Sequence, residues 1–176
     1  MANTWRATSQ AVAFASAKHM LDVHNTSAST RYIRVYRCYQ FNNGTGAVTG
    51  ILCTMRIMRS TTNPTAGSAV TPVPHNIGNS VLNAGTTAGT GRTNTVTSIF
   101  RQYLWSNDEP TVSLATMDEW ELLVPFAEVW NAGYGDTNVE PLMCRASNSE
   151  GVSMQQSSAS AVGTNDFEME FTDAAS

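Results

Sequence analysis

Residues 29–60 read STRYIRVYRCYQFNNGTGAVTGILCTMRIMRS, and this stretch indicates the fold more clearly than any other. Two runs rich in β-branched and aromatic residues flank NNGTG, a turn built from Asn and Gly, whose glycines supply the positive φ that a tight reversal needs. We therefore predict a β-hairpin over residues 29–60. Each run also carries arginines, which indicates that one face of the hairpin is exposed to solvent.

Both runs alternate between two faces, as side chains on a strand must. Arg37 interrupts the apolar face of the first run. The apolar positions are otherwise Ile33, Val35, Tyr39 and Phe41 in the first run and Ile51, Cys53, Met55 and Ile57 in the second. Since neither run has a purely polar face, we expect the core to cover one side and a neighbour the other.

Strand patterns continue on both sides of this stretch. KHMLDVHN (18–25) alternates like a half-buried strand, and VTSIFRQYLW (96–105) reads as another. PLMCRAS (141–147) and GVSMQQ (151–156) predict a second hairpin. ELLVPF (121–126) is read as a strand, with a short helix as the alternative. DFEMEFT (166–172) is the cleanest amphipathic strand, with Phe167, Met169 and Phe171 pointing inward.

About eight or nine strands with turn signals at short intervals predict an all-β protein: an antiparallel, jelly-roll-like β-sandwich. Residues 18–176 form its single domain. Residues 1–17 are interpreted as an arm that docks on its own domain or on a neighbour. Residues 61–97, with three prolines and a low-complexity run, predict one long irregular loop with a short edge strand within 70–82.

Charged residues make up only 14% of the chain, against about 25% in ordinary proteins. Nine of the ten basic groups and a single acid, Asp22, lie in residues 1–101, so this part carries +8, whereas residues 102–176 carry −12. One interpretation is that strands of the two halves pair within one subunit. The other is that a basic face of one subunit meets an acidic face of the next.

The three cysteines, Cys38, Cys53 and Cys144, are predicted to be small buried hydrophobes in a reducing compartment, with a Cys38–Cys53 pair left open. No run approaches the roughly 18 apolar residues of a membrane helix. The N-terminus lacks the pattern of a secretion signal. We therefore expect no membrane contact and synthesis in the cytoplasm without export.

Chemical motifs are scarce in the sequence. His19 and His24 are predicted to lie on opposite faces of a strand and, like His75, at the surface or the edge of the core, so we expect no metal site and no cofactor. No nucleophile has a partner pattern, and the acids at 108–109, 118–121 and 168–170 are read as solvated surface. The expectation is therefore that the protein is not an enzyme.

Nucleic acid is not expected as a partner. Arginine interleaved with tyrosine on a strand can grip a nucleic-acid backbone and stack on bases. Alternation places Arg31 and Arg37 on one face of the strand and Arg34 on the other, so the basic patch is split.

Four features together resemble structural proteins of virus particles, especially bacteriophage β-sandwich and jelly-roll capsid or capsid-decorating proteins. They are the unsignalled chain rich in Ala, Thr, Asn and Ser, the arm MANTWRATSQAVAFASA (1–17), the arginine-bearing hairpin (29–60) and the loop TTNPTAGSAVTPVPHNIGN (61–79). The resemblance implies a non-enzymatic virion subunit present in many copies, with itself and a capsid shell as partners. The low charge and the preference for arginine over lysine also favour a subunit that uses its surface for contacts. The expected interface residues are Trp5, Phe14, Arg34, Arg37, Arg56 and Arg59.

Two other functions stay open. One is a carbohydrate-binding or adhesin module that uses Trp105, Tyr134 or the 61–97 loop. The other is a small jelly-roll hydrolase or lyase, which would need two carboxylates facing each other across a cleft.

Overall fold

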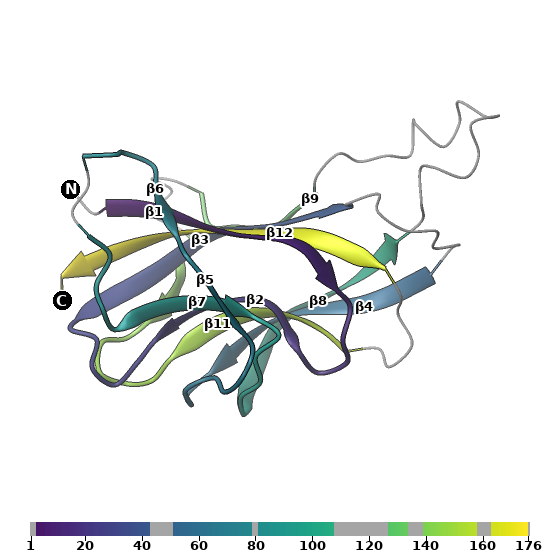
Figure 1. Cartoon of the computed structure of the whole chain (residues 1–176), viewed down its shortest axis with the longest axis horizontal. Coiled ribbons are helices and arrows are strands. Elements are labelled where there is room, and N and C mark those ends of the chain that lie inside the picture. Colours follow the sequence, from purple (N-terminus) through teal and green to yellow (C-terminus); the bar gives the residue numbers. More distant parts are fainter. Residues whose placement is uncertain are drawn as a thin grey trace.

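The computed structural model describes residues 3–42, 51–78, 81–107, 127–133, 139–157 and 163–175. These residues form two antiparallel sheets packed face to face, which confirms the predicted all-β sandwich (Figure 1). They contain no helix that is long and apolar enough to cross a membrane. The strands are β1 (Asn3–Ala13), β2 (His19–Asn25), β3 (Arg31–Asn42), β4 (Ile51–Ser60), β5 (Ser68–Val70), β6 (Val73–Pro74), β7 (Thr86–Thr90), β8 (Val96–Asn107), β9 (Ala127–Asn131), β10 (Leu142–Cys144), β11 (Gly151–Gln156) and β12 (Thr164–Ala175).

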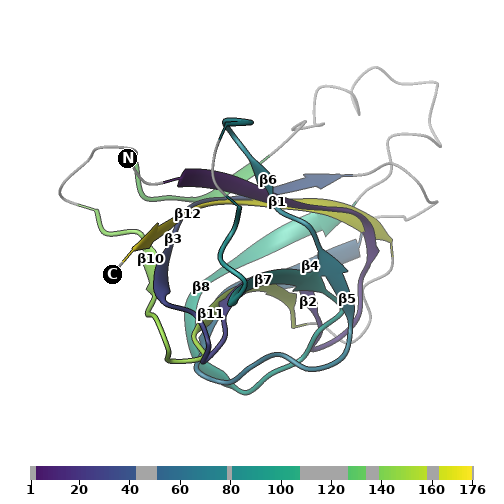
Figure 2. The same ribbon diagram turned by 60° about the vertical axis from the view of Figure 1, so that its left-hand side comes forward.

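Sheet A has the order β10-β3-β12-β1-β6, and sheet B has the order β5-β7-β2-β11-β4-β8. The short strands β9 and β10 follow one another along the same edge of β3. Figure 2, turned by 60° from Figure 1, shows the layer of β1, β12 and β3 stacked on the layer of β2, β7 and β11.

The long strands pair in a nested order. β1 pairs with β12, β2 with β11, β3 with β10 and β9, and β4 with β8. The first strand thus meets the last, and each later pair lies inside the one before. The four nested pairs are arranged like one long hairpin that curls around the core. The curling brings β3 beside β12 and β4 beside β11, which gives two further pairs. This is the topology of a jelly roll.

The hairpin predicted over residues 29–60 is wrong. β3 and β4 lie in different sheets, on opposite sides of the core, and residues 43–46 of the predicted turn lie outside the described residues. The second predicted hairpin is wrong for the same reason, since β10 belongs to sheet A and β11 to sheet B. Alternation identifies a strand with one apolar face, but two such strands satisfy that face equally well side by side or across a sandwich.

The N-terminal segment is a strand of sheet A. Residues 3–13 form β1 and lie between β12 and β6, so the expected arm docks on its own domain. Trp5, Ala7 and Ser9 are buried in alternation. This period of two is easy to miss in the sequence because two of the three inward residues are small.

Residues 61–97 are less irregular than predicted, because they contain β5, β6 and β7. β5 and β7 extend the β2 edge of sheet B, while β6 extends the β1 edge of sheet A. The segment therefore closes the side of the sandwich opposite β8 (Figure 1). The predicted short edge strand is confirmed by β6, which pairs with β1 and ends at Pro74, a residue that a sheet tolerates at its edge.

The core lies between the two sheets. Phe167, Met169 and Phe171 on β12 are fully buried, as predicted. A β-bulge in β3 between Val35 and Arg37 explains how Arg37 escapes from the apolar face. The extra residue reverses the alternation, so the buried positions change from Ile33 and Val35 to Cys38 and Gln40. The strand predicted over residues 121–126 lies outside the described residues.

Candidate functional site

A cluster of buried polar side chains lies on β2. All seven residues of β2 are buried, whereas the sequence predicts a half-buried strand. A β-bulge at Met20 shifts the register, so Leu21 lies opposite Met154 and His19 opposite Gln155. The bulge lets His19 and Asp22 meet with a separation of 3.0 Å between Nδ1 and Oδ2. The prediction that His19 and His24 are surface or core-edge residues on opposite faces is therefore wrong.

Asp22 forms an ion pair with Arg92, which follows β7. Arg92 Nη1 lies 3.2 Å from Asp22 Oδ1, and Nη2 donates to the carbonyl of Ala88 at 2.9 Å. The guanidinium lies over Gly89, where a Cβ would be only 2.1 Å from Nε. A residue with a side chain at position 89 would thus displace the cation that neutralises the buried carboxylate.

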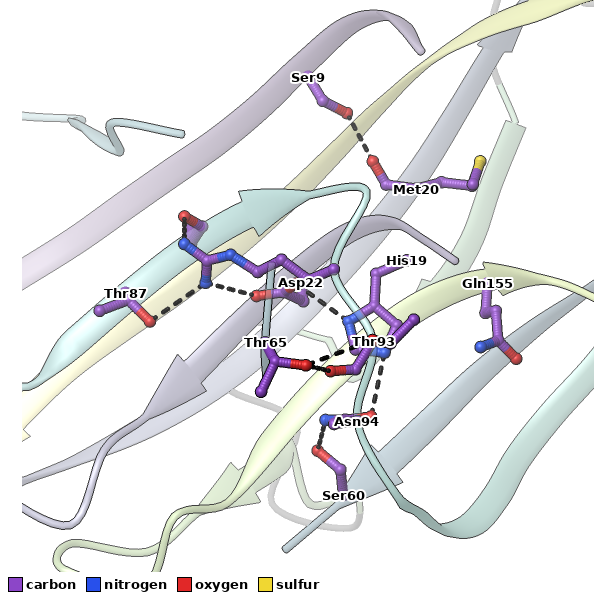
Figure 3. Close-up of polar contacts among 12 residues, drawn as sticks. Ser9, His19, Met20, Asp22, Ser60, Thr65, Thr87, Thr93, Asn94 and Gln155 are labelled. Carbon is purple, nitrogen blue, oxygen red and sulfur yellow. Dashed lines mark hydrogen bonds and ion pairs between the residues drawn. The ribbon is translucent and has the colours of Figure 1, made fainter. Parts of the chain in front are cut away.

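Two asparagines connect the histidines to the surface. His19 Nε2 lies 3.0 Å from Asn94 Oδ1, and Asn94 Nδ2 donates to Ser60 Oγ at 2.5 Å. Figure 3 shows this chain of contacts from Asp22 through His19 and Asn94 to Ser60. On the other side, His24 Nε2 lies 3.0 Å from Asn63 Oδ1. Each buried imidazole therefore fixes the orientation of one carboxamide in the loops above it.

These loops, residues 61–66 and 91–95, form the two walls of an open cleft of about 360 Å³, which we call the Thr/Asn cleft. Thr65 and Thr93 connect the walls through a backbone bridge of 2.8 and 3.1 Å, and the Thr95 amide donates to Thr62 Oγ1 at 3.1 Å. Figure 3 shows Thr65 and Thr93 side by side near His19. The lining residues are Thr62, Asn63, Thr65, Thr93, Asn94 and Thr95.

The described residues contain no group of three His, Cys, Asp or Glu that is suited to hold a metal ion. Ser60 contacts Asn94 rather than a histidine, so it lacks the base that a serine nucleophile needs. The cysteines are free and buried. Burial raises the pKa of Cys53 to about 11 and that of Cys144 to about 12, which keeps both thiols protonated at neutral pH.

Glu168 and Glu170, one of the carboxylate pairs considered for hydrolysis, lie on β12 with Arg6 of the neighbouring strand. Arg6 Nη1 is 3.3 Å from Glu168, and Nη2 binds Glu170 directly. Glu170 is buried, so the expectation of a solvated surface acid is wrong for this residue. Both carboxylates share one guanidinium, which is a structural arrangement rather than that of an acid and a base facing each other across a cleft.

The six residues predicted to form an interface do not come together. Trp5 lies in the core, and Phe14 packs against it. Arg34 and Arg37 are on sheet A, whereas Arg56 and Arg59 are on sheet B. Arg56 donates to Gln102 at 3.0 Å, and Arg59 donates to the carbonyl of Met143 at 2.7 Å.

Part of the charge asymmetry between the halves is used inside the subunit. Arg37 lies 3.7 Å from Glu128, and Arg31 lies 3.9 Å from Asp173. Together with Arg6, these residues connect the basic half to the acidic half across adjacent strands. The interpretation that the two halves pair within one subunit therefore holds for these pairs.

Sequence reasoning missed the cluster around Asp22. The signal was present, because Asp22 is the only acid among residues 1–101 and stands between two histidines in an apolar run. Arg92, which pairs with Asp22, and Asn94 and Asn63, which contact the two histidines, are far away in the chain, in a segment read as an irregular loop. Only the fold brings them to β2.

Comparison of the chain with protein-family models, with curated proteins and with solved structures finds no match.

The buried His24 predicts a loss of stability in mild acid. Burial lowers the pKa of His24 from its ordinary 6.5, and the bond to Asn63 offsets part of this shift. Asp22, Arg92 and His19 face the same ring. Since the unfolded chain binds a proton more readily than the folded one, the free energy of unfolding should fall as pH drops below 6.5 toward the lowered pKa. Urea unfolding between pH 7.5 and 5 measures this slope.

The matched variants are His24→Gln and His75→Gln, the latter at an exposed histidine whose Nε2 lies 3.8 Å from Glu170 Oε1. His24→Gln should flatten the slope between pH 6.5 and 5, and His75→Gln should change it less. Equal slopes in all three proteins would contradict the assignment to His24.

Proposed function

We propose that this protein is a multi-copy structural subunit of a virus particle, either a capsid-lattice or a capsid-decorating subunit, that stabilises the particle through contacts between copies. The jelly-roll topology supports the proposal by analogy, because this fold is used by viral capsid domains, although lectins and cupins use it too. One observation favours the subunit function specifically, namely the edge strand β8.

β8 is a long edge strand whose outer face carries two exposed apolar side chains, Ile99 and Leu104, among polar ones. Ten of its twelve residues have partners on β4, and no other described strand pairs with its second side. Long apolar edges are ready templates for another chain, and monomeric proteins usually shorten, charge or cover them. A subunit built for assembly uses the same backbone groups and side chains to bind its neighbour.

The register with β4 shows which side chains point outward. Cys53 and Met55 face the core, so Leu104 and Gln102, which lie opposite Thr54 and Arg56, are on the outer face. Ile99 lies on the same face beyond the β-bulge, opposite Met58. Ile99 is 49% exposed and Leu104 is 65% exposed. We call Ile99, Gln102, Leu104 and Arg56 the β8 face; it includes one arginine that the sequence predicts at an interface.

Leu104→Lys tests the proposal. Burying one leucine in an interface contributes about 1.5–3 kcal/mol, so the variant should weaken self-association about tenfold or more while leaving the monomer folded. Sedimentation velocity over a concentration series measures the association, and electron microscopy of the native source shows the particle. The control is Val81→Lys, at an even more exposed apolar residue outside β8 (89% exposed).

The proposal is supported if Val81→Lys still self-associates like the wild type and Leu104→Lys self-associates more weakly. A wild-type chain that stays monomeric at high micromolar concentration, and that fails to bind particles from its source, would overturn it.

A further inference from the structure

We propose that the Thr/Asn cleft binds a neutral carbohydrate, with one sugar ring held by the hydroxyl and carboxamide groups of Thr62, Asn63 and Thr95. The cleft has about 360 Å³, at the small end of the roughly 300–1,000 Å³ typical of ligand sites. All six lining residues are threonine or asparagine. The inference does not depend on the subunit function proposed above.

The polar groups that the cleft leaves available match those of a sugar. Asn63 uses Oδ1 toward His24, which leaves the two hydrogens of Nδ2 as donors. Thr62 Oγ1 accepts from the Thr95 amide, which leaves its hydroxyl hydrogen as a donor. Thr95 Oγ1 has no partner among the described residues and offers both functions. A sugar hydroxyl donates and accepts at once, so it satisfies such a mixed set of groups.

The cleft is also held in place before any ligand arrives. His24 orients Asn63, and His19 together with Ser60 orients Asn94. The Thr65–Thr93 bridge fixes the spacing of the two walls. Because these groups are already ordered by buried partners, binding costs little of the side-chain entropy that weakens flexible polar sites.

The charge distribution favours a neutral ligand over an anionic one. Arg92, which precedes Thr93 of one wall, is bonded to Asp22 and to the Ala88 carbonyl, so its charge is already compensated. No lining residue carries a charge. An anion in this cleft would lose water without gaining a counter-charge, whereas a neutral polyol exchanges water hydrogen bonds for equivalent ones.

The test is an NMR titration of the full chain, which follows the side-chain amide signals of Asn63 and Asn94. The probes are glucose, galactose, mannose, N-acetylglucosamine and N-acetylgalactosamine, with N-acetylneuraminate as the anionic arm. The variant Thr95→Val removes one hydroxyl from an exposed position and keeps the shape of the side chain. The matched control is Thr71→Val, an exposed threonine outside the cleft.

At least one neutral sugar should shift the signals of both asparagines in a saturable way. Thr95→Val should lower the affinity for that sugar about fivefold, which corresponds to the loss of one hydrogen bond. Thr71→Val should bind the sugar like the wild type. Three results would overturn the proposal: no response to any neutral sugar, a response to N-acetylneuraminate alone, or binding that Thr95→Val leaves unchanged. Backbone amide spectra of each variant show that it is folded.

Discussion

Gly151→Ala should destabilise the protein by about 3 kcal/mol, the upper part of the range for overpacked interiors. A Cβ at position 151 would lie 2.2 Å from His24 Nδ1 and 3.1 Å from His24 Cγ. The imidazole has no room to retreat, because it is buried and Nε2 is held at Asn63. In an open strand the same change would be favourable, since alanine loses less backbone entropy than glycine. Urea unfolding at pH 7.5 measures the difference.

Gly78→Ala is the control, because a Cβ there would be 3.4 Å from Asn76 Oδ1 in an exposed turn, and its effect should stay within about 0.5 kcal/mol. A double-mutant cycle with His24→Ala identifies the cause. Once the ring is removed, the added methyl group has space, so we expect a coupling energy of about 2 kcal/mol. A cost of Gly151→Ala that persists in full without the imidazole would refute the clash with His24.

Asp22→Asn should cost about 3 kcal/mol, because removing one partner of a buried ion pair leaves the other charge uncompensated. The substitution keeps the size of the side chain, but it leaves Arg92 without its carboxylate. It also places an amide where Asp22 now meets both Arg92 and His19. Stability is again measured by urea unfolding, and Glu140→Gln, at an exposed residue, is the control for loss of one negative charge.

The substitutions Asp22→Asn and Arg92→Met, made singly and together, form a second double-mutant cycle. Removing both charges should cost less than the sum of the single changes by about 2 kcal/mol, since neither charge is then left alone. Additive effects would show that the ion pair carries no coupling and that Asp22 acts only through its contact with His19.

Much of the fold follows from local patterns in the chain. The alternation in residues 166–172 predicts the inward Phe167, Met169 and Phe171, and these are fully buried in β12. The runs at 31–42, 51–60 and 96–105 are strands where the pattern indicates them. Pro74 predicts an edge position, and it ends an edge strand. These features depend on backbone sterics and on the burial of one face, which neighbouring residues specify.

Those local patterns do not predict how the strands pair or where the polar site forms. Each predicted hairpin joined two real strands that the fold places in opposite sheets, because an apolar face fits a partner across the core as well as one beside it. The sequence pattern also does not predict the register shifts at β-bulges. The bulge in β3 turns Arg37 outward, and the bulge in β2 brings His19 to Asp22.

Local sequence therefore specifies that this chain is made of strands, and which faces of most strands are apolar. The nested order of the jelly roll and the meeting of Asp22 with Arg92, 70 residues apart, arise only when the whole chain packs. The physical reason is the distance along the chain over which each interaction acts. Alternation is imposed by bonds between neighbours, whereas pairing and ion-pair formation are selected by the free energy of the assembled core, to which distant residues contribute together.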